Sequence, residues 1–166
     1  DMPKKEAFFE DIVFFEKEFD GVMPLEIMID TQRKKGVMKL STLRRMDELE
    51  KTIDEIPELS KPISIVNLVK YSKQAYYNGN PDYYDLPSSQ EQSFILSYAK
   101  NATKKSKDNL MKSYVDSTGQ FARITTFMRD ENGDNIAKIE AEIRKKADKI
   151  FPPDQYKVTI TGKALV

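Results

Sequence analysis

Chemistry in this chain would have to rest on carboxylates, lysines, tyrosines and hydroxyls, because its 166 residues include no histidine and no cysteine. The missing histidine removes the commonest general base and the commonest zinc ligand. The missing cysteine excludes disulfides, thiolate metal sites and cysteine nucleophiles. No pair among the 27 acidic residues stands out by an apolar setting. We therefore expect no enzyme, no catalytic residue, no metal and no cofactor.

One acidic segment, Asp130-Glu131-Asn132-Gly133-Asp134, superficially resembles a calcium loop. An EF-hand loop needs glycine at its sixth position, where Asn135 stands, and glutamate at its twelfth, where Ala141 stands. Both requirements fail. The pattern instead favours a turn into a helix whose N-cap is Asp134.

A second candidate is a binding lip of acids and tyrosines, which comprises Asp82, Asp85, Tyr76, Tyr77, Tyr83 and Tyr84. Tyrosine offers a large amphipathic contact area at modest entropy cost. The favoured alternative is an ordinary surface loop whose tyrosines pack on neighbouring helices.

Two apolar sets are candidates for handling lipids or other hydrophobic molecules. One is the stripe of Phe8, Ile12, Phe15 and Phe19 on a first helix; the other is the set of methionines at 23, 28, 38, 111 and 128, which would suit an adaptable groove. In both cases ordinary core packing is the favoured interpretation.

Nucleic-acid binding is not expected, because Lys plus Arg equals Asp plus Glu at 27 each. The nearest candidate for a basic patch, Lys104-Lys105-Ser106-Lys107, lacks interleaved aromatic residues and favours a solvated loop. Asn101-Ala102-Thr103 matches a glycosylation sequon, which would be idle in a bacterial protein.

These residues must be positioned by an alternating set of helices and strands. Hydrophobic periodicity predicts an amphipathic helix over 4–19, a half-buried strand over 25–30 and a helix that starts at Ser41 or Thr42 and ends before Pro57. A short strand of Ile63, Ile65 and Val66 follows. The buried stripe of the second helix is expected to comprise Leu43, Met46, Leu49 or Glu50, Ile53 and Ile56.

The second half of the chain begins with two helices over 67–102. The first of these is capped by Asn67 and carries Leu68, Tyr71 and Ala75 inward; the second has a capping box of Ser88 and Glu91 and an apolar face of Phe94, Ile95, Tyr98 and Ala99. A hairpin then joins 110–116 to 121–130 around 117–120. A last helix carries Ile136, Ile139, Ile143, Ala147 and Ile150, and a closing strand alternates Tyr156, Val158 and Ile160.

This order predicts one α+β domain over 1–166. Helices cover one face of a mostly antiparallel, ferredoxin-like (split βαβ) sheet, and the two helices over 67–102 form an insertion. The strand-helix-strand order over 25–66 predicts a right-handed crossover between parallel strands.

Several segments in this order resemble a known family. They are a Phe-rich helix, then residues 21–30 (GVMPLEIMID), 62–70 (PISIVNLVK), 121–130 (FARITTFMRD) and 158–166 (VTITGKALV). Together they are similar to the first extracytoplasmic loop of RND-superfamily exporters, particularly the MMPL-like branch. The sharpest matching pieces are Gly21-x-x-Pro24 and Thr161-Gly162.

The resemblance implies a porter-type domain of a proton-driven exporter in the bacterial inner membrane, with this segment on the periplasmic side. The implied partners are transmembrane helices, a second extracytoplasmic loop of the same protein and hydrophobic or amphiphilic cargo. The way the chain begins and ends fits an excised loop of that kind. Two alternatives stay open: a free-standing ferredoxin-like small-molecule-binding or regulatory module, and, least favoured, a hydrolase or transferase that uses carboxylates.

Overall fold

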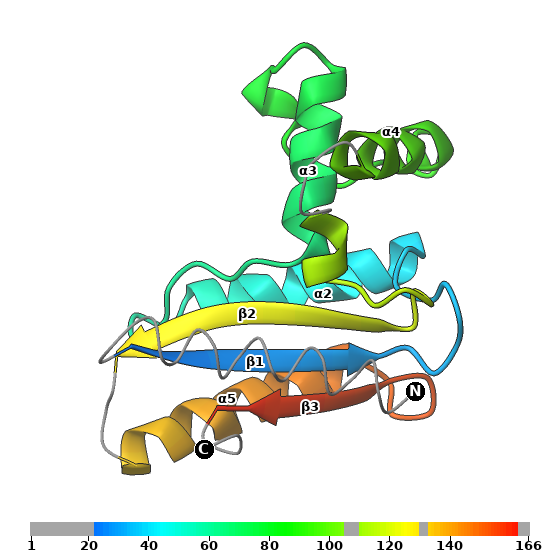
Figure 1. Ribbon diagram of the computed structural model, residues 1–166. Coiled ribbons are helices and arrows are strands. Elements are labelled where there is room, and N and C mark those ends of the chain that lie inside the picture. Colours follow the sequence, from blue (N-terminus) through cyan, green and yellow to red (C-terminus); the bar gives the residue numbers. More distant parts are fainter. Residues whose placement is uncertain (1–21, 105–109, 130–132, 163–166) are drawn as a thin grey trace.

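The computed structural model describes residues 22–104, 110–129 and 133–162, and these form an α+β fold (Figure 1). Three strands, β1 (Val22–Asp30), β2 (Phe121–Arg129) and β3 (Lys157–Thr161), make one antiparallel sheet in the order β2-β1-β3. The helices are α2 (Leu40–Asp54), α3 (Ile65–Tyr76), α4 (Gln92–Lys104) and α5 (Gly133–Ile150), with short 3-10 turns η1 (Pro81–Tyr83) and η2 (Leu110–Ser113). Among these described helices, none is long and apolar enough to cross a bilayer. The helix expected over 4–19, with its phenylalanine stripe, falls outside the described residues.

Helices α2 and α5 pack on the same face of the sheet, as expected (Figure 1). On β1, the side chains of Leu25, Ile27 and Ile29 point to that face and are fully buried. The predicted stripes of the two helices are confirmed, since each of their members is buried: Leu43, Met46, Leu49, Ile53 and Ile56 after β1, and Ile136, Ile139, Ile143, Ala147 and Ile150 before β3. We call these three strands and two helices the sheet layer.

The opposite face of β1 is also buried, so the prediction of a half-buried strand is wrong. Glu26 and Met28 are each only 2% exposed. The Glu26 carboxylate accepts a hydrogen bond of 2.8 Å from the Thr125 hydroxyl and lies 3.8 Å from the Arg123 guanidinium. A buried charge is tolerated where it is paired and hydrogen-bonded, which the sequence alternation does not reveal.

The strand predicted at Ile63, Ile65 and Val66 is absent, because α3 begins at Ile65. Ser64, and not the predicted Asn67, is the N-cap of that helix: its hydroxyl accepts from the Val66 amide at 3.0 Å, and the Asn67 side chain, inside the first turn, accepts from the Ser64 amide at 2.9 Å. The preceding segment pairs with β2 only through isolated antiparallel bridges, Leu59 to Met128 and Ile63 to Thr125. It therefore runs in the same direction as β1, as the crossover predicted, but β2 lies between them.

The first strand of the predicted 110–130 hairpin is also absent. Residues 110–113 form the turn η2, and only Val115 bridges to Ala122 on β2. Helix α2 likewise starts at Leu40 rather than after a Ser41 or Thr42 cap, and α5 starts at Gly133, one residue before the predicted cap. The Thr42 hydroxyl instead shares a 2.9 Å hydrogen bond with the Tyr156 hydroxyl, which ties α2 to the approach to β3.

The two helices expected over 67–102 are present as α3 and α4, and they extend away from the sheet layer (Figure 1). We call α3, η1 and α4 the helical projection. Of the three residues named on the predicted helix, Leu68 is partly buried against the core, whereas Tyr71 and Ala75 are exposed. The buried residues of α3 are Ile65, Val66, Val69, Ser72 and Lys73, and hydrophobic periodicity does not reveal the two polar ones.

Candidate functional site

The best candidate for a binding site is a groove of about 430 Å³ between the end of the sheet layer and the helical projection. Its floor is apolar and comprises Met38, Met111 and Val115. Its rim is basic and comprises Lys35, Lys100 and Lys112. A smaller apolar recess of about 200 Å³ shares Met38, Lys100 and Met111 with it and adds Leu96. We call the two together the methionine groove.

One wall of the groove consists of the loop after β1, which is hydrogen-bonded to the turn before β2. The Lys35 amide donates to the Thr118 carbonyl at 2.9 Å, and the Val37 amide donates to the Gly119 carbonyl at 2.9 Å. Gly119 has a φ of 73°, and a Cβ there would lie 3.0 Å from the Lys35 Cα. Only glycine permits this close approach without strain, so Gly119 fixes the wall.

The other wall consists of α4 and η2. Ile95 and Ala99 anchor α4 in the core with full burial, as predicted, whereas Phe94 and Tyr98, which were predicted on the same apolar face, are 40% and 38% exposed. This anchoring turns Leu96 and Lys100, on the next positions of the helix, toward the groove. Residues 110–113 fold as a turn rather than a strand, which brings Met111 and Lys112 to the same opening.

The carboxylate among the groove's lining residues, that of Asp116, is hydrogen-bonded within the chain. Asp116 is 8% exposed, and its carboxylate accepts from the Thr118 amide and hydroxyl, at 3.3 and 2.6 Å, and from the Phe121 amide at 2.9 Å. These bonds hold the 116–120 turn, which forms part of one wall of the groove.

The structure divides the five methionines named from the sequence. Met23, Met28 and Met128 are buried in the core, which confirms the favoured interpretation for them. Met38 and Met111 are only partly buried and lie together in the groove, although 73 residues separate them in the chain. Sequence reasoning did not identify the three rim lysines, because no local motif joins them.

The predicted lip of acids and tyrosines is organised around Lys73, which the sequence did not single out. The Lys73 ammonium lies 2.6 Å from Asp85 and 2.9 Å from Glu91, and the Tyr77 hydroxyl donates to Glu91. The predicted capping box is present: Glu91 accepts from the Ser88 amide at 3.0 Å. That bond, with those from Tyr77 and Lys73, lowers the pKa of Glu91 to about 2.

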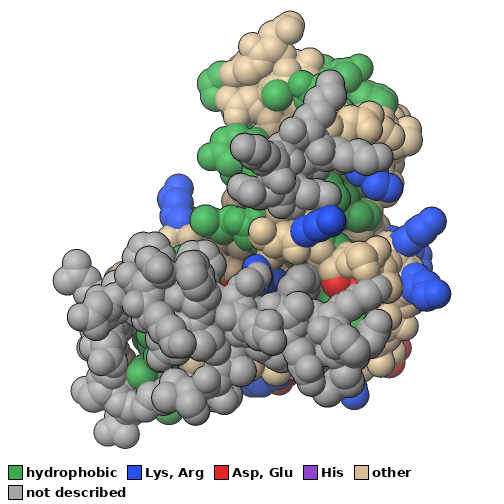
Figure 2. Space-filling model, in the orientation of Figure 1, with side chains coloured by type: hydrophobic (Ala, Val, Ile, Leu, Met, Phe, Trp, Pro, Cys, Tyr) green, Lys and Arg blue, Asp and Glu red, His purple; other side chains and the backbone are tan. Residues whose placement is uncertain are grey.

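Burial alone would lower the pKa of Lys73, but its bonds to Asp85 and Glu91 raise it above its usual value. The tyrosines pack on one another, as favoured: Tyr77 stacks on Tyr83 at 4.2 Å and Tyr71 meets Tyr84 edge-on at 4.8 Å. Asp82 is exposed. Tyr76 contacts Phe94 and Tyr98, and these three rings remain partly exposed. Hydrophobic side chains are also visible at the surface of the helical projection in Figure 2. The lip is thus a structural cluster with an exposed aromatic edge.

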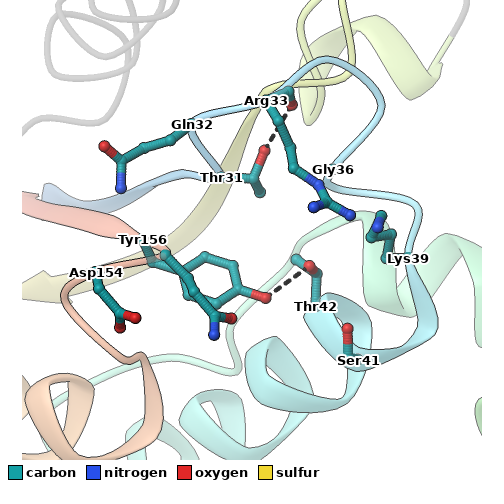
Figure 3. A pocket seen from close by; sticks show the side chains of 10 residues that line it. Thr31, Gln32, Arg33, Gly36, Lys39, Ser41, Thr42, Asp154 and Tyr156 are labelled. Atoms are coloured by element: carbon teal, nitrogen blue, oxygen red, sulfur yellow. Dashed lines mark hydrogen bonds between the residues drawn. The ribbon is translucent and has the colours of Figure 1, made fainter.

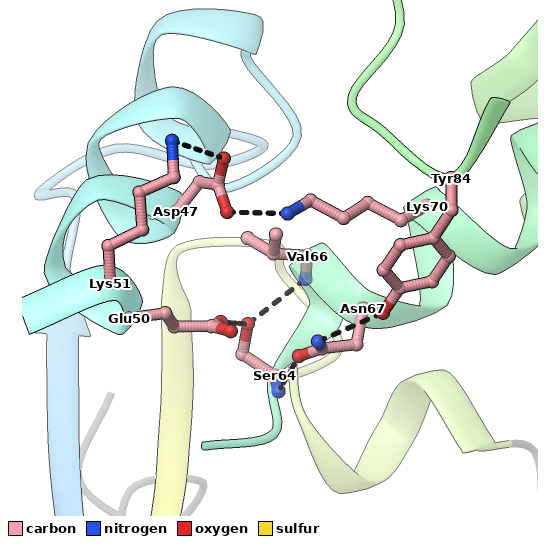
Figure 4. A network of polar contacts seen from close by, with 8 residues as sticks. All are labelled: Asp47, Glu50, Lys51, Ser64, Val66, Asn67, Lys70 and Tyr84. Carbon is pink, nitrogen blue, oxygen red and sulfur yellow. Dashed lines mark hydrogen bonds and ion pairs between the residues drawn. The ribbon is translucent and has the colours of Figure 1, made fainter. Parts of the chain in front are cut away.

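A polar network joins α2 to the start of α3 (Figure 4). The Ser64 hydroxyl donates to the Glu50 carboxylate, and the Lys70 ammonium lies 2.7 Å from Asp47. Burial raises the pKa of Glu50 to about 7, against the bond from Ser64, which lowers it. A broad cavity of about 750 Å³ opens beside this network. Because Ser64 is fully buried, the pair offers no accessible nucleophile.

A polar pocket of about 300 Å³ lies where the loop after β1 meets the start of α2 (Figure 3). Arg33 and Lys39 line it together with three residues whose hydroxyl-bearing side chains are buried. The hydroxyls of Thr42 and Tyr156 bond to each other, and that of Thr31 donates to the carbonyls of Arg33 and Gln120. All three hydroxyls are therefore hydrogen-bonded within the chain.

The remaining sequence candidates form no site in the part of the chain that the structure describes. No cluster of three or more acidic side chains there could hold a metal ion, and 130–132 of the calcium-like segment fall outside it. Lys104 ends α4, Lys105 and Lys107 are not among the described residues, and Asn101 is exposed on α4. No protein-family profile matches the chain, and no curated protein matches its sequence.

Proposed function

We propose that this chain is the extracytoplasmic porter-type domain of an RND/MMPL-like, proton-driven exporter. In this proposal it forms part of the path or gate for hydrophobic or amphiphilic cargo on the periplasmic side of a bacterial inner membrane. Its partners are the transmembrane helices and the second extracytoplasmic loop of the same protein. The chain itself carries out no catalysis and needs no cofactor.

The observation that carries the proposal is the order and direction of the strands. If the segment at 59–63 is counted as a shortened edge strand, the sheet order becomes β3, β1, β2 and that segment, and all neighbours are antiparallel. With α2 and α5 on one face, this is the arrangement of a split βαβ, ferredoxin-like frame. The helical projection is then an insertion between its second and third strands.

The position of the methionine groove also supports the proposal. The groove lies where the projection meets the frame, and its floor is apolar under a charged rim. Sites between a rigid scaffold and an inserted element are common places for ligands to bind. Amphiphilic cargo has the matching combination of apolar and polar parts.

The flanking gene sequence tests the proposal directly. We expect the reading frame to continue on both sides of this segment into stretches of about 20 apolar residues, which would cross the membrane. A second porter-type segment should follow further along. A start codon just before Asp1 together with a stop codon just after Val166 would overturn the exporter proposal.

One observation favours a second candidate, a free-standing ferredoxin-like binding or regulatory module. The methionine groove combines the apolar side chains of Met38, Met111 and Leu96 with lysine and hydroxyl groups, which is a lining suited to a small-molecule ligand. Such a module would keep its ligand affinity with no membrane-spanning flanks in the gene. The same gene sequence therefore separates the two functions.

A further inference from the structure

We propose that the cavity between α2 and α3 binds a small organic amine, whose primary ammonium group pairs with the Glu50 carboxylate. This is the cavity of about 750 Å³ beside the polar network of Figure 4, and we call it the Glu50 cavity. It lies on other elements than the methionine groove. The inference therefore does not depend on the exporter proposal and can be tested without it.

The first step is the incomplete pairing of the Glu50 carboxylate. Glu50 is only 6% exposed, and one of its carboxylate oxygens accepts a hydrogen bond from the Ser64 hydroxyl. The other oxygen has no hydrogen-bond partner among the described residues, yet it is not sealed from solvent. Because Glu50 lines the cavity, a guest with a hydrogen-bond donor can reach this oxygen.

The second step is the sign of the guest. The lining carries three acids and three lysines, so the number of charges does not select a sign, but their positions do. Asp47 and Asp54 both raise the pKa of Glu50, and Lys70 opposes them. The Lys70 ammonium is already engaged, since it lies 2.7 Å from Asp47. The surroundings of the Glu50 carboxylate therefore favour a positive guest.

The other two lysines at the cavity do not change this balance. Lys51 and Lys61 are exposed, and neither is among the charges that shift the pKa of Glu50. A buried carboxylate without a counter-ion tends to take up a proton, and burial indeed raises the pKa of Glu50 to about 7. An ammonium guest supplies the missing counter-ion and holds the carboxylate in its charged form.

The third step is the body of the guest. Ile63 and Tyr71 are 43% and 61% exposed, and both line the cavity together with Leu68 and Tyr84. These side chains offer packing area to a ring or an alkyl stem, and a tyrosine ring also attracts a cation. Among the described residues no group of acids could hold a metal ion, so an organic cation fits the lining better. The volume is within the usual range for small-molecule sites.

NMR titration of the 166-residue chain tests the inference with three probes of matched size. They are 2-phenylethylammonium, 2-phenylethanol and phenylacetate, which differ in the charge of the polar group. At pH 8 we expect the amine to bind about tenfold more tightly than the other two, or better. At pH 6 the affinity for the amine should be about tenfold lower, because Glu50 must first release a proton while the amine stays charged.

A matched pair of variants on α2 locates the site. Glu50 lines the cavity, whereas Glu48 is exposed and is not part of the lining. Glu50→Gln should lower the affinity for the amine at pH 8 about tenfold, remove its pH dependence and leave 2-phenylethanol binding unchanged. Glu48→Gln should alter none of these. The amide signals of Ser64 and Val66 should shift when the amine binds, and circular dichroism checks that both variants fold.

Four results would overturn the inference. They are equal affinity for the amine and the alcohol at pH 8, an amine affinity that is the same at pH 6 and pH 8, and an equal response of Glu50→Gln and Glu48→Gln. The fourth is tighter binding of Nα-acetyl-lysine amide than of 2-phenylethylammonium, which would assign the cavity to a lysine side chain of a partner protein. None of these results bears on the gene-sequence test of the exporter proposal.

Discussion

The sheet layer and the helical projection are stabilised by different kinds of contact. In the sheet layer, aliphatic side chains from β1, α2 and α5 meet at zero or near-zero exposure. In the projection, a buried lysine with two carboxylates and a set of stacked tyrosines supply many of the contacts between α3, η1 and α4. The first region depends on burial of apolar area, and the second adds paired charges and ring contacts to buried aliphatic anchors such as Ile65, Val69 and Ile95.

This difference predicts which region should lose stability when the pH changes or a residue is mutated. Apolar packing is insensitive to protonation, whereas ion pairs and buried carboxylates respond to it directly. The junction between the regions, where Glu50 meets Ser64, belongs to the second type. We therefore expect a change of pH to act on the projection and on its junction with the sheet layer before it acts on the apolar core of the sheet layer.

Truncation of a core side chain is the largest test of the comparison. Ile27→Ala on the central strand should cost about 3–4 kcal/mol of unfolding free energy, because it leaves a cavity at a fully buried position. Urea denaturation measures the loss. Ile63→Ala, at a 43% exposed position between the regions, should cost less than about 1 kcal/mol. Similar costs for the two would erase the distinction.

The second test acts on the junction. The pKa of Glu50 is raised to about 7, so its contribution to stability is complete below about pH 4.5 and is lost as pH rises through about 7. Glu50→Gln keeps an acceptor for the Ser64 hydroxyl and removes the charge. We expect this variant to be more stable than the parent at pH 8, by on the order of 2–3 kcal/mol, and equal to it at pH 4.

Asp47, Asp54 and Lys70 also act on the Glu50 charge, so the control must leave them in place. Glu58→Gln removes an exposed carboxylate from the loop after α2 and should change stability by less than about 0.5 kcal/mol at either pH. Chemical denaturation across pH 4 to 8 reports both variants. An identical pH profile for Glu50→Gln and its parent would show that the buried carboxylate does not control the junction.

The contrast between the regions also explains which parts of the structure were predictable. The stripes of α2 and α5 follow strict helical spacing, so aliphatic periodicity predicted both helices and their buried faces. The capping box of Ser88 and Glu91 was also predictable, since it is a local pattern of two residues at fixed spacing.

The errors fall where a polar group is buried by a distant partner. Lys73 is buried beside Asp85 and Glu91, which lie outside α3, so hydrophobic periodicity within that helix could not place it on the buried face. Glu26 was placed on a solvated face, although Thr125 and Arg123 surround it. The lysines of the groove come from three separate segments. Such partners are set by tertiary folding, and no spacing rule within one element reveals them.

The third test separates local from global stability. Lys73→Met removes the cation that lies between Asp85 and Glu91 and should leave the Glu91 carboxylate without its ion pair. We expect a loss of about 1 kcal/mol, reduced by solvent screening of the partly exposed acids. Hydrogen exchange should accelerate in α4 and leave α2 unchanged, because only the projection opens.

Lys51→Met is the matched control, since its ammonium is 74% exposed and lies 3.9 Å from Asp47. It should change neither helix. If Lys73→Met accelerated exchange throughout β1 and α2, the projection and the sheet layer would unfold as one unit. The two regions would then differ in the kinds of contact that they contain but not in their stability.

The smallest effect is expected at the exposed aromatic edge. Tyr76 is 46% exposed and contacts the rings of Phe94 and Tyr98 at 5.2 and 5.7 Å. Tyr76→Ser should cost about 0.5 kcal/mol, because most of the lost area is already in water and the ring pairs contribute little beyond it. Thermal denaturation measures the loss of stability in Tyr76→Ser and in Ile95→Ala, which truncates a buried side chain on α4. A cost for Tyr76→Ser equal to that of Ile95→Ala would mean that ring contacts, rather than aliphatic burial, hold the projection together.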